Sequence, residues 1–156
     1  MRRSVACRTV TIALALAALA GPANVHGQGA ASAQQDDDAA IRRLLAEGYA
    51  TAVFVTRDEP GVRRAFHPEF RMLVLDDGGV LVVTLDRWLE RLGLDGTPSD
   101  ERVEHRVTGV TVTGDAASAR VEIWENGARI YSDHFLLYRF PEVGWRIVGK
   151  IFHDHD

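Results

Sequence analysis

The sequence predicts an α+β domain, in which helices in the N-terminal half are segregated from a bent antiparallel sheet in the C-terminal half. Before Arg102, most apolar residues recur at the spacing of amphipathic helices, whereas after it they alternate with polar residues, as in half-buried strands. Asn126-Gly127, the strongest two-residue hairpin signal in the chain, lies within the alternating half. The expected order is helix, helix, hairpin, helix and then four long antiparallel strands.

The first 27 residues predict an export signal. They combine three arginines and no acidic residue with an apolar run from Thr9 to Ala20, followed by small residues. The run has about a dozen residues, fewer than the roughly 20 that a membrane-spanning helix needs. Cleavage after Gly27 and cleavage after Ala23 both fit this pattern. We therefore expect an exported protein, located in the periplasm or outside the cell.

Removal of residues 1–27 changes the composition of the chain. The mature length becomes 156 − 27 = 129 residues, and 18 − 3 = 15 basic residues then face 22 acidic ones, so the formal charge moves from -4 to about -7. Cys7, the only cysteine, is removed with the signal, which excludes disulfides and cysteine-ligated metals. Because the chain is acidic and has no basic cluster, nucleic acid is disfavoured as a binding partner. A neutral or cationic small molecule is favoured instead.

The mature chain is expected to start with a disordered tether over 28–35, which is rich in Ala, Ser, Gln and Gly and has no periodicity. The folded domain is expected over 36–156. Its first helix should begin near Asp36, where three consecutive aspartates suit an N-terminus. The apolar face of this helix is formed by Ile41, Leu44, Leu45, Gly48, Tyr49, Ala52 and Val53.

Two further helices flank a predicted hairpin. The second helix runs from the cap signal at 58–60 to about Phe66, where His67-Pro68 ends it. Residues 71–75 and 80–83 are strand-like and are joined by a turn sequence. Thr84 then caps the third helix, which Gly93 ends in a left-handed conformation.

The second half predicts four strands. Within the first of them, the apolar phase changes at Thr108-Gly109, which predicts a bulge that bends the strand. The remaining strands cover 117–123, 130–140 and 145–153.

Four short segments carry a family resemblance, namely Tyr49, Phe66-His67-Pro68, Asp133-His134-Phe135 and Trp145-Arg146-Ile147-Val148. Together they resemble the nuclear transport factor 2-like superfamily, and most closely its branch described as putative lumazine-binding, which is related to polyketide-cyclase-like and steroid-isomerase-like proteins. The resemblance implies a conical, cystatin-like fold whose curved sheet wraps a pocket closed by three helices, and commonly a homodimer. It does not imply one function, because this fold hosts several kinds of enzyme as well as binding proteins.

Two residues match the oxyanion-binding pair of the steroid isomerases in this superfamily. The resemblance places Tyr49 and Asp133 in that pair, where a protonated carboxylic acid and a phenol both donate hydrogen bonds. Isomerisation also needs a carboxylate base on the first strand, and that position falls at Val74, with Asp76 two residues further. The general base of an isomerase is therefore missing.

A second candidate site follows from the Asn126-Gly127 hairpin. A symmetrical hairpin places Arg120 opposite Asp133 and Glu122 opposite Tyr131 on one sheet face. An arginine between two carboxylates, close to a tyrosine, resembles the water-activating arrangement of limonene epoxide hydrolase. The alternative is an exposed ion pair of little energetic weight.

The two candidate sites conflict. An arginine beside Asp133 would hold the carboxylate ionised and prevent it from donating to an oxyanion. The apolar face of the same two strands, which should pack on the helices, is the opposite one, formed by Ala117, Ala119, Val121, Ile123, Ile130 and Leu136. The resemblance nevertheless places Asp133 in the pocket, and a hairpin of odd length would change the pairing, so both orientations remain open.

Other residues are candidates for a ligand site or for the core. We expect Trp88, Tyr131, Phe135, His67 and Phe152 to contact a small molecule, with core packing as the alternative for the aromatic residues and a ring-to-backbone hydrogen bond for His67.

The only lysine, Lys150, lies on a predicted strand and is therefore of interest as a functional residue. Compositional bias together with an exposed position explains it equally well. No cofactor or metal is expected. The sequence favours an exported small-molecule-binding protein without robust catalysis. The alternative is a pocket hydrolase, lyase or isomerase that uses Asp133 with Tyr49, or with Arg120 and Glu122.

Overall fold

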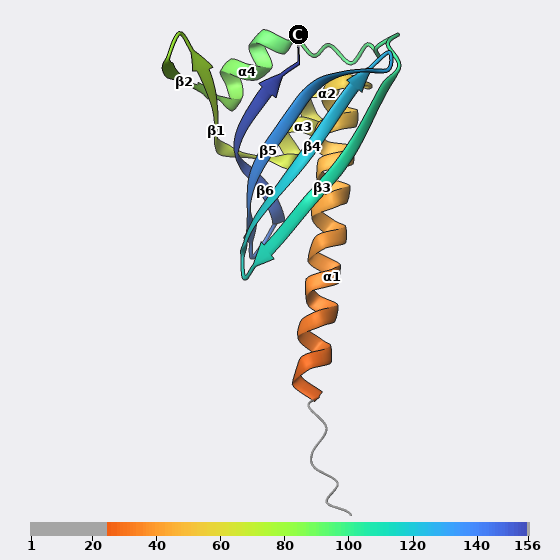
Figure 1. Ribbon diagram of the computed structural model, residues 1–156, viewed down its shortest axis with the longest axis vertical. Helices are drawn as coiled ribbons and strands as arrows, with labels where there is room; N and C mark the ends of the chain where they lie inside the picture. The colour runs from red at the N-terminus through yellow and green to blue at the C-terminus, as the bar shows by residue number, and fades with distance from the viewer. Residues whose placement is uncertain (1–24, 156) are drawn as a thin grey trace, which may run out of the picture.

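A computed structural model describes residues 25–155 (Figure 1). The helical elements are α1 (Val25–Leu45), η1 (Ala46–Thr51), α2 (Ala52–Phe54), α3 (Glu59–Ala65) and α4 (Leu85–Leu92). The strands are β1 (Phe66–Asp76), β2 (Gly79–Thr84), β3 (Val103–Thr113), β4 (Ala116–Glu125), β5 (Ala128–Phe140) and β6 (Gly144–Asp154). Because the backbone stays helical through Leu45 and Ala52, α1, η1 and α2 form one continuous rod. Together with α3 and α4 this gives the three expected helices.

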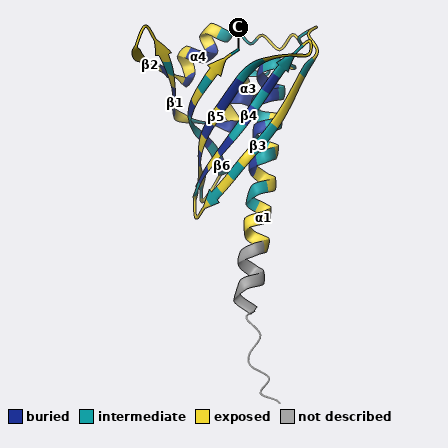
Figure 2. Cartoon of the chain, in the orientation of Figure 1, coloured by how far each residue is buried: buried dark blue, intermediate teal, exposed yellow. Residues whose placement is uncertain are grey.

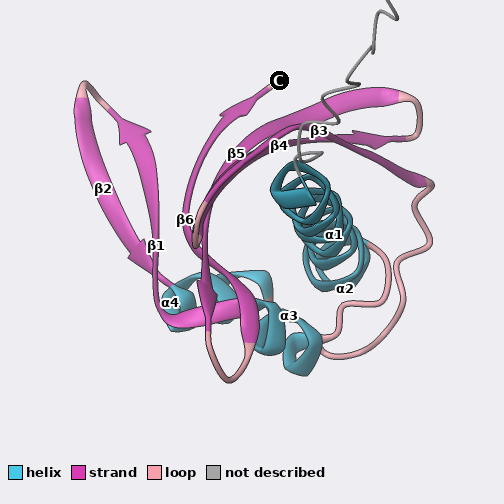
Figure 3. Cartoon of the chain, turned by 90° about the horizontal axis from the view of Figure 1, so that it is seen from below, coloured by secondary structure: helices cyan, strands magenta, loops and turns pink. Residues whose placement is uncertain are grey.

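The six strands form one open sheet in the order β2-β1-β6-β5-β4-β3. All neighbours are antiparallel except β1 and β6, which are parallel, so the sheet is mixed. Figure 3 shows β3 to β6 curving around the helical rod, with α3 and α4 near the start of β1, and the β1–β2 hairpin diverging from the sheet beyond its pairing with β6. The α+β cone predicted from the sequence is thus confirmed.

The hydrophobic core lies between the concave face of the sheet and the helices (Figure 2). On β4, every second residue is buried and faces the helices, as expected from the alternation of this segment. The inward-facing residues of β4 are Ala117, Ala119, Val121 and Ile123.

One-residue β-bulges bend β3, β5 and β6. The bulge on β3 lies at Gly109, whose φ of 61° favours glycine, and it confirms the prediction at Thr108-Gly109. In the other two bulges the extra residues are Ile130 on β5 and Val148 on β6. Neither has a pairing partner on the neighbouring strand. Each bulge reverses which side chains of its strand point inward, and this decides the composition of the interior site.

The first helix begins earlier than expected. It starts at Val25 and continues through the segment 28–35 that was predicted as a tether, since alanine and glutamine propagate a helix well. The aspartates expected to cap it instead join it to the sheet. Asp37 accepts hydrogen bonds from the Trp145 indole at 3.0 Å and from Arg139 at 3.0 Å.

The predicted helix and turn signals near α4 and at the β4–β5 hairpin are confirmed. The Thr84 hydroxyl accepts a hydrogen bond from the backbone N–H of Arg87, and Gly93 ends α4 in the left-handed region. Asn126 and Gly127 both have positive φ, as the tight hairpin requires.

Most of the predicted signal peptide, residues 1–24, lies outside the described residues. Within residues 25–155, no helix combines the length and apolar character needed to cross a bilayer.

Candidate functional site

Three polar side chains from distant parts of the chain meet inside the cone. The Tyr49 hydroxyl on η1 donates a hydrogen bond to Asp133 Oδ2 on β5 at 2.6 Å. Lys150 Nζ on β6 donates to the Tyr49 oxygen at 3.0 Å and lies 2.8 Å from Asp133 Oδ1. Tyr49 and Asp133 are fully buried, and only 6% of Lys150 is exposed. We call these three residues the interior triad.

Asp133 and Lys150 form an unusual ion pair. Burying two charges is costly, and the cost is offset only when the charges are close and hydrogen-bonded. Asp133 Oδ2 accepts from Tyr49, but Oδ1 faces the ammonium without the angles of a good hydrogen bond. The two charges are therefore buried together at close range, with the Tyr49 hydroxyl as a further hydrogen-bond donor to the carboxylate.

Lys150 points inward because of the bulge on β6. Ile147 pairs with Leu137, whereas Gly149 pairs with Leu136, so Val148 is the extra residue. A regular strand that buries Ile147 would turn Lys150 outward, but the inserted residue reverses the alternation. The bulge thus places the only lysine of the chain in the core, a position that the sequence left open.

The bulge on β5 decides the position of Asp133 in the same way. Close to the turn, Glu125 pairs with Ala128, as in the symmetrical hairpin, but beyond Ile130 the register shifts by one residue. Asp133 consequently faces Val121, and it shares the inward face with the apolar residues of β4. Asp133 and the apolar residues of β4 thus share the concave face, which resolves the conflict. The prediction is wrong for Leu136, which is exposed on the outer face because the bulge reverses the alternation of β5.

The predicted pairing of Arg120 with Asp133 is therefore wrong. Arg120 pairs with His134, and both belong to the lining of a groove on the outer face of the sheet. Glu122 lies on the same outer face, 2.5 Å from Arg120 and 3.4 Å from Arg129. The hydrolase-like arrangement of Asp133 with Arg120 and Glu122 is not formed.

Tyr49 lies in a π-helical turn packed against aromatic rings. Such wide turns insert one residue into a helix and are frequent at functional sites. The Phe135 ring packs edge-on against Tyr49 at 4.8 Å between centroids, and Phe54 does so at 5.6 Å. These contacts fix the ring, so the hydroxyl is held between the other two members of the interior triad.

The ammonium of Lys150 is surrounded by aromatic rings, in addition to its contacts with Tyr49 and Asp133. Its Nζ lies 4.9 to 6.0 Å from five ring centroids, those of Tyr49, Phe152, Trp88, Phe135 and Tyr131. Burial lowers the pKa of Lys150 below its usual value, although the nearby Asp133 carboxylate opposes this shift. Burial and the same carboxylate raise the pKa of the Tyr49 phenol well above its usual range. Tyr49 therefore stays a neutral donor and acceptor across the physiological range.

A cavity of about 90 Å³ adjoins the triad. Lys150 is part of its wall, and the other lining residues are Val53, Phe54, Met72, Trp88, Leu92, Tyr131 and Phe152. Phe54, Leu92, Tyr131 and Phe152 are only half-buried, so the cavity lies close to the surface. Three of the residues expected to contact a ligand, Trp88, Tyr131 and Phe152, thus line one cavity.

The other two expected ligand contacts lie elsewhere. Phe135 packs on Tyr49 and does not line the interior cavity. His67 stacks on Phe140 at 4.7 Å, and its Nδ1 accepts a hydrogen bond from the backbone N–H of Glu69 at 3.1 Å. His67 therefore has the structural role that was its alternative interpretation.

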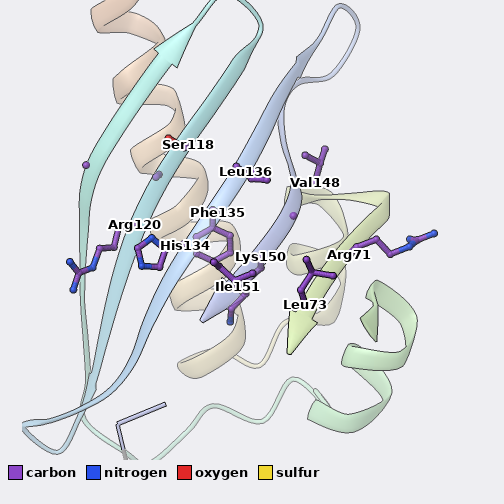
Figure 4. Close-up of a pocket in the computed structure, with 13 residues that line it drawn as sticks. Arg71, Leu73, Ser118, Arg120, His134, Phe135, Leu136, Val148, Lys150 and Ile151 are labelled. Atoms are coloured by element: carbon purple, nitrogen blue, oxygen red, sulfur yellow. The ribbon is translucent and has the colours of Figure 1, made fainter. Parts of the chain in front are cut away.

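The outer face of the sheet carries a larger groove of about 650 Å³ (Figure 4). It runs over β3 to β6 and is bounded on one side by Arg71 and Leu73 of β1. Its surroundings include the exposed hydrophobic residues Leu136, Tyr138 and Ile151. Arg120 and His134 belong to the lining of this groove, and so does Lys150, whereas Tyr49 and Asp133 do not.

The triad differs chemically from the oxyanion-binding pair suggested by the resemblance. Asp133 accepts a hydrogen bond from Tyr49 and is paired with an ammonium, so it is arranged as an acceptor and not as a donor. On β1 the inward-facing residues Phe70, Met72 and Val74 are apolar. No carboxylate therefore occupies the position of the isomerase base. The interior can offer one ammonium, one phenol and an apolar wall to a small molecule.

Lys150 is the residue that the sequence interpretation underestimated. Its signal was present, because a single lysine in a chain whose other basic residues are all arginine is unusual. A lysine shifts its pKa on burial more readily than an arginine does, which suits a buried functional position. No described group of three or more His, Cys, Asp or Glu residues is arranged to hold a metal ion.

The fold is the α+β cone that solved NTF2-like proteins share. Within this class, the chain belongs to the family described as "Putative lumazine-binding", whose model matches residues 36–153. No curated protein matches the sequence.

Solved structures support the fold. An NTF2-like protein of unknown function from Shewanella baltica superposes with a TM-score of 0.66 at 23% identity, covering 78% of this chain and 96% of that one. An NTF-2 like protein of unknown function from Silicibacter pomeroyi gives 0.65 at 24% identity, covering 78% and 98%. A putative ketosteroid isomerase from Shewanella frigidimarina gives 0.56 at 16% identity, covering 75% and 97%. At these identities the likeness establishes the fold alone.

Proposed function

We propose that the protein is an exported small-molecule-binding protein whose ligand occupies the interior cavity and contacts Lys150. The observation that carries this proposal is the buried Lys150–Asp133 pair at the wall of an aromatic cavity. A buried ion pair contributes little net stability compared with an apolar core, so a role in recognition is a better reason for its presence. The family description supports a small molecule as the partner.

The cavity limits the size of the ligand. A volume of about 90 Å³ corresponds to roughly three water molecules at ~30 Å³ each. A small monocyclic or short-chain compound fits with little rearrangement. Lumazine, the compound in the family description, is bicyclic and needs a larger space than this volume.

Thermal unfolding with a panel of small heterocycles, lumazine included, tests the proposal. A ligand present at 100 times its dissociation constant stabilises the folded state by about 2.7 kcal/mol, which raises the Tm by several degrees. Leu92→Phe fills the cavity and should abolish the shift. Leu94→Phe is the matched control, because Leu94 is also half-buried but does not line the cavity. The proposed site would be contradicted if no compound in the panel raised the Tm, or if Leu92→Phe left a ligand-induced rise in Tm unchanged.

Export and dimer formation belong to the same proposal. The arginines and the apolar run in residues 1–27 support export, and N-terminal sequencing of the secreted protein tests it. The exposed residues Leu136, Tyr138 and Ile151 around the outer groove support a homodimer through that face of the sheet. Sedimentation velocity measures the dimer directly, and a monomer at high protein concentration would exclude it.

A further inference from the structure

We propose that Lys150 captures small aldehydes as an imine inside the interior cavity. This inference rests on the proposed function, since it assigns a ligand class to the same cavity. It requires an accessible amine, neighbouring groups that move protons, and a space that fits the carbonyl compound.

The amine shares its space with the cavity. Lys150 Nζ lies 5.0, 5.4 and 6.0 Å from the ring centroids of Phe152, Trp88 and Tyr131, and all three rings line the cavity. A molecule among these rings therefore approaches the nitrogen. Lysines held in apolar surroundings beside another ionisable group are a recurrent source of amine nucleophiles in enzymes.

The triad supplies the proton transfers. Asp133 Oδ1, 2.8 Å from Nζ, can accept a proton from the ammonium and so free the nitrogen lone pair. The lone pair then bonds to the carbonyl carbon, and the carbonyl electron pair moves to oxygen, which is protonated. Tyr49, hydrogen-bonded to both Lys150 and Asp133 Oδ2, offers a second route for the proton beside the direct contact.

The overall step is balanced without an oxidant or reductant. The ammonium and the aldehyde give a protonated imine and one water molecule. Two of the three ammonium protons leave with the carbonyl oxygen as water, and the third stays on nitrogen. The positive charge is conserved, so the Asp133 carboxylate and the surrounding rings stabilise the product as they stabilise the ammonium.

The volume of the interior cavity and the residues that line it define the class of aldehyde. About 90 Å³ accommodates a short alkyl chain, and the aromatic and aliphatic lining favours an apolar one. Burial, which lowers the pKa of Lys150, increases the fraction of free amine near neutral pH. Propanal is therefore a suitable probe.

Reductive trapping of the full chain with propanal and cyanoborohydride tests the inference. Because the chain has one lysine, its α-amino group is the only other primary amine and serves as an internal reference. An ordinary lysine with a pKa near 10.4 has roughly 250-fold less free amine at neutral pH than an α-amino group with a pKa near 8. We expect Lys150, located by peptide mapping, to be propylated at least as fast as the α-amino group. Modification confined to the α-amino group would overturn the inference.

Two comparisons tie the reaction to the cavity. Leu92→Phe should slow trapping at Lys150 at least tenfold and leave the α-amino group unchanged, whereas Leu94→Phe should change neither. A naphthaldehyde, too large for the cavity, should modify the α-amino group alone. If panel compounds bind but propanal is not trapped, the imine inference fails alone. If neither binding nor trapping occurs, the proposed function fails with it.

Discussion

Lys150→Met is expected to lower the free energy of unfolding by about 3–5 kcal/mol, the usual result of removing one partner of a buried ion pair. Asp133 would then be fully buried with Tyr49 as its one remaining hydrogen-bond donor among the described residues. Urea unfolding at neutral pH measures the loss.

A second substitution separates charge from packing. In Lys150→Met combined with Asp133→Asn, the uncompensated charge is gone and the amide oxygen still accepts from Tyr49, so most of the lost stability should return. Arg102→Met is the matched control, because it removes a cation from the exposed ion pair with Glu104 and should change stability little. A Lys150→Met variant as stable as the Arg102→Met control would show that the pair is not buried.

Gly48→Ala is expected to cost about 1–3 kcal/mol, the typical effect of overfilling a packed site. A Cβ on Gly48 would overlap the Cβ of Ala65, which is buried at the end of α3. The helical rod and α3 would have to separate, and Tyr49, the next residue, would move with the rod. Ligand-induced stabilisation should therefore weaken together with intrinsic stability.

A double-mutant cycle tests the cause of this effect. Ala65→Gly restores the space, so Gly48→Ala should be much less destabilising in the Ala65→Gly background than in the wild type. Additive effects of the two substitutions would mean that the helices do not touch at this point.

The sequence predicted the features that depend on local chemistry. The bulge at Gly109 was predictable because a glycine marked it and the apolar phase changed on either side. The caps at Thr84 and Gly93 and the turn at Asn126-Gly127 were predictable for the same reason, since each residue type favours the required backbone conformation.

The composition of the interior site was only partly predictable. Tyr49 and Asp133 were identified through the family resemblance, but the two bulges that control the interior lie at Ile130 and Val148, which have no special turn chemistry. A one-residue shift in register exchanges the two faces of a strand, so a missed bulge misplaces every residue beyond it. This is why Arg120 was paired with Asp133 and why the inward position of Lys150 was not predicted.

The pKa of Lys150 tests the central claim most directly, namely that its amine is buried with Tyr49 and Asp133 beside the cavity. Protein made with isotope-labelled lysine gives a single lysine signal in NMR spectra, because the chain has one lysine. Burial predicts a titration midpoint below the ordinary value of about 10.4, and a chemical shift displaced by the neighbouring rings. A midpoint at the ordinary value with the chemical shift of a solvent-exposed lysine would contradict the claim.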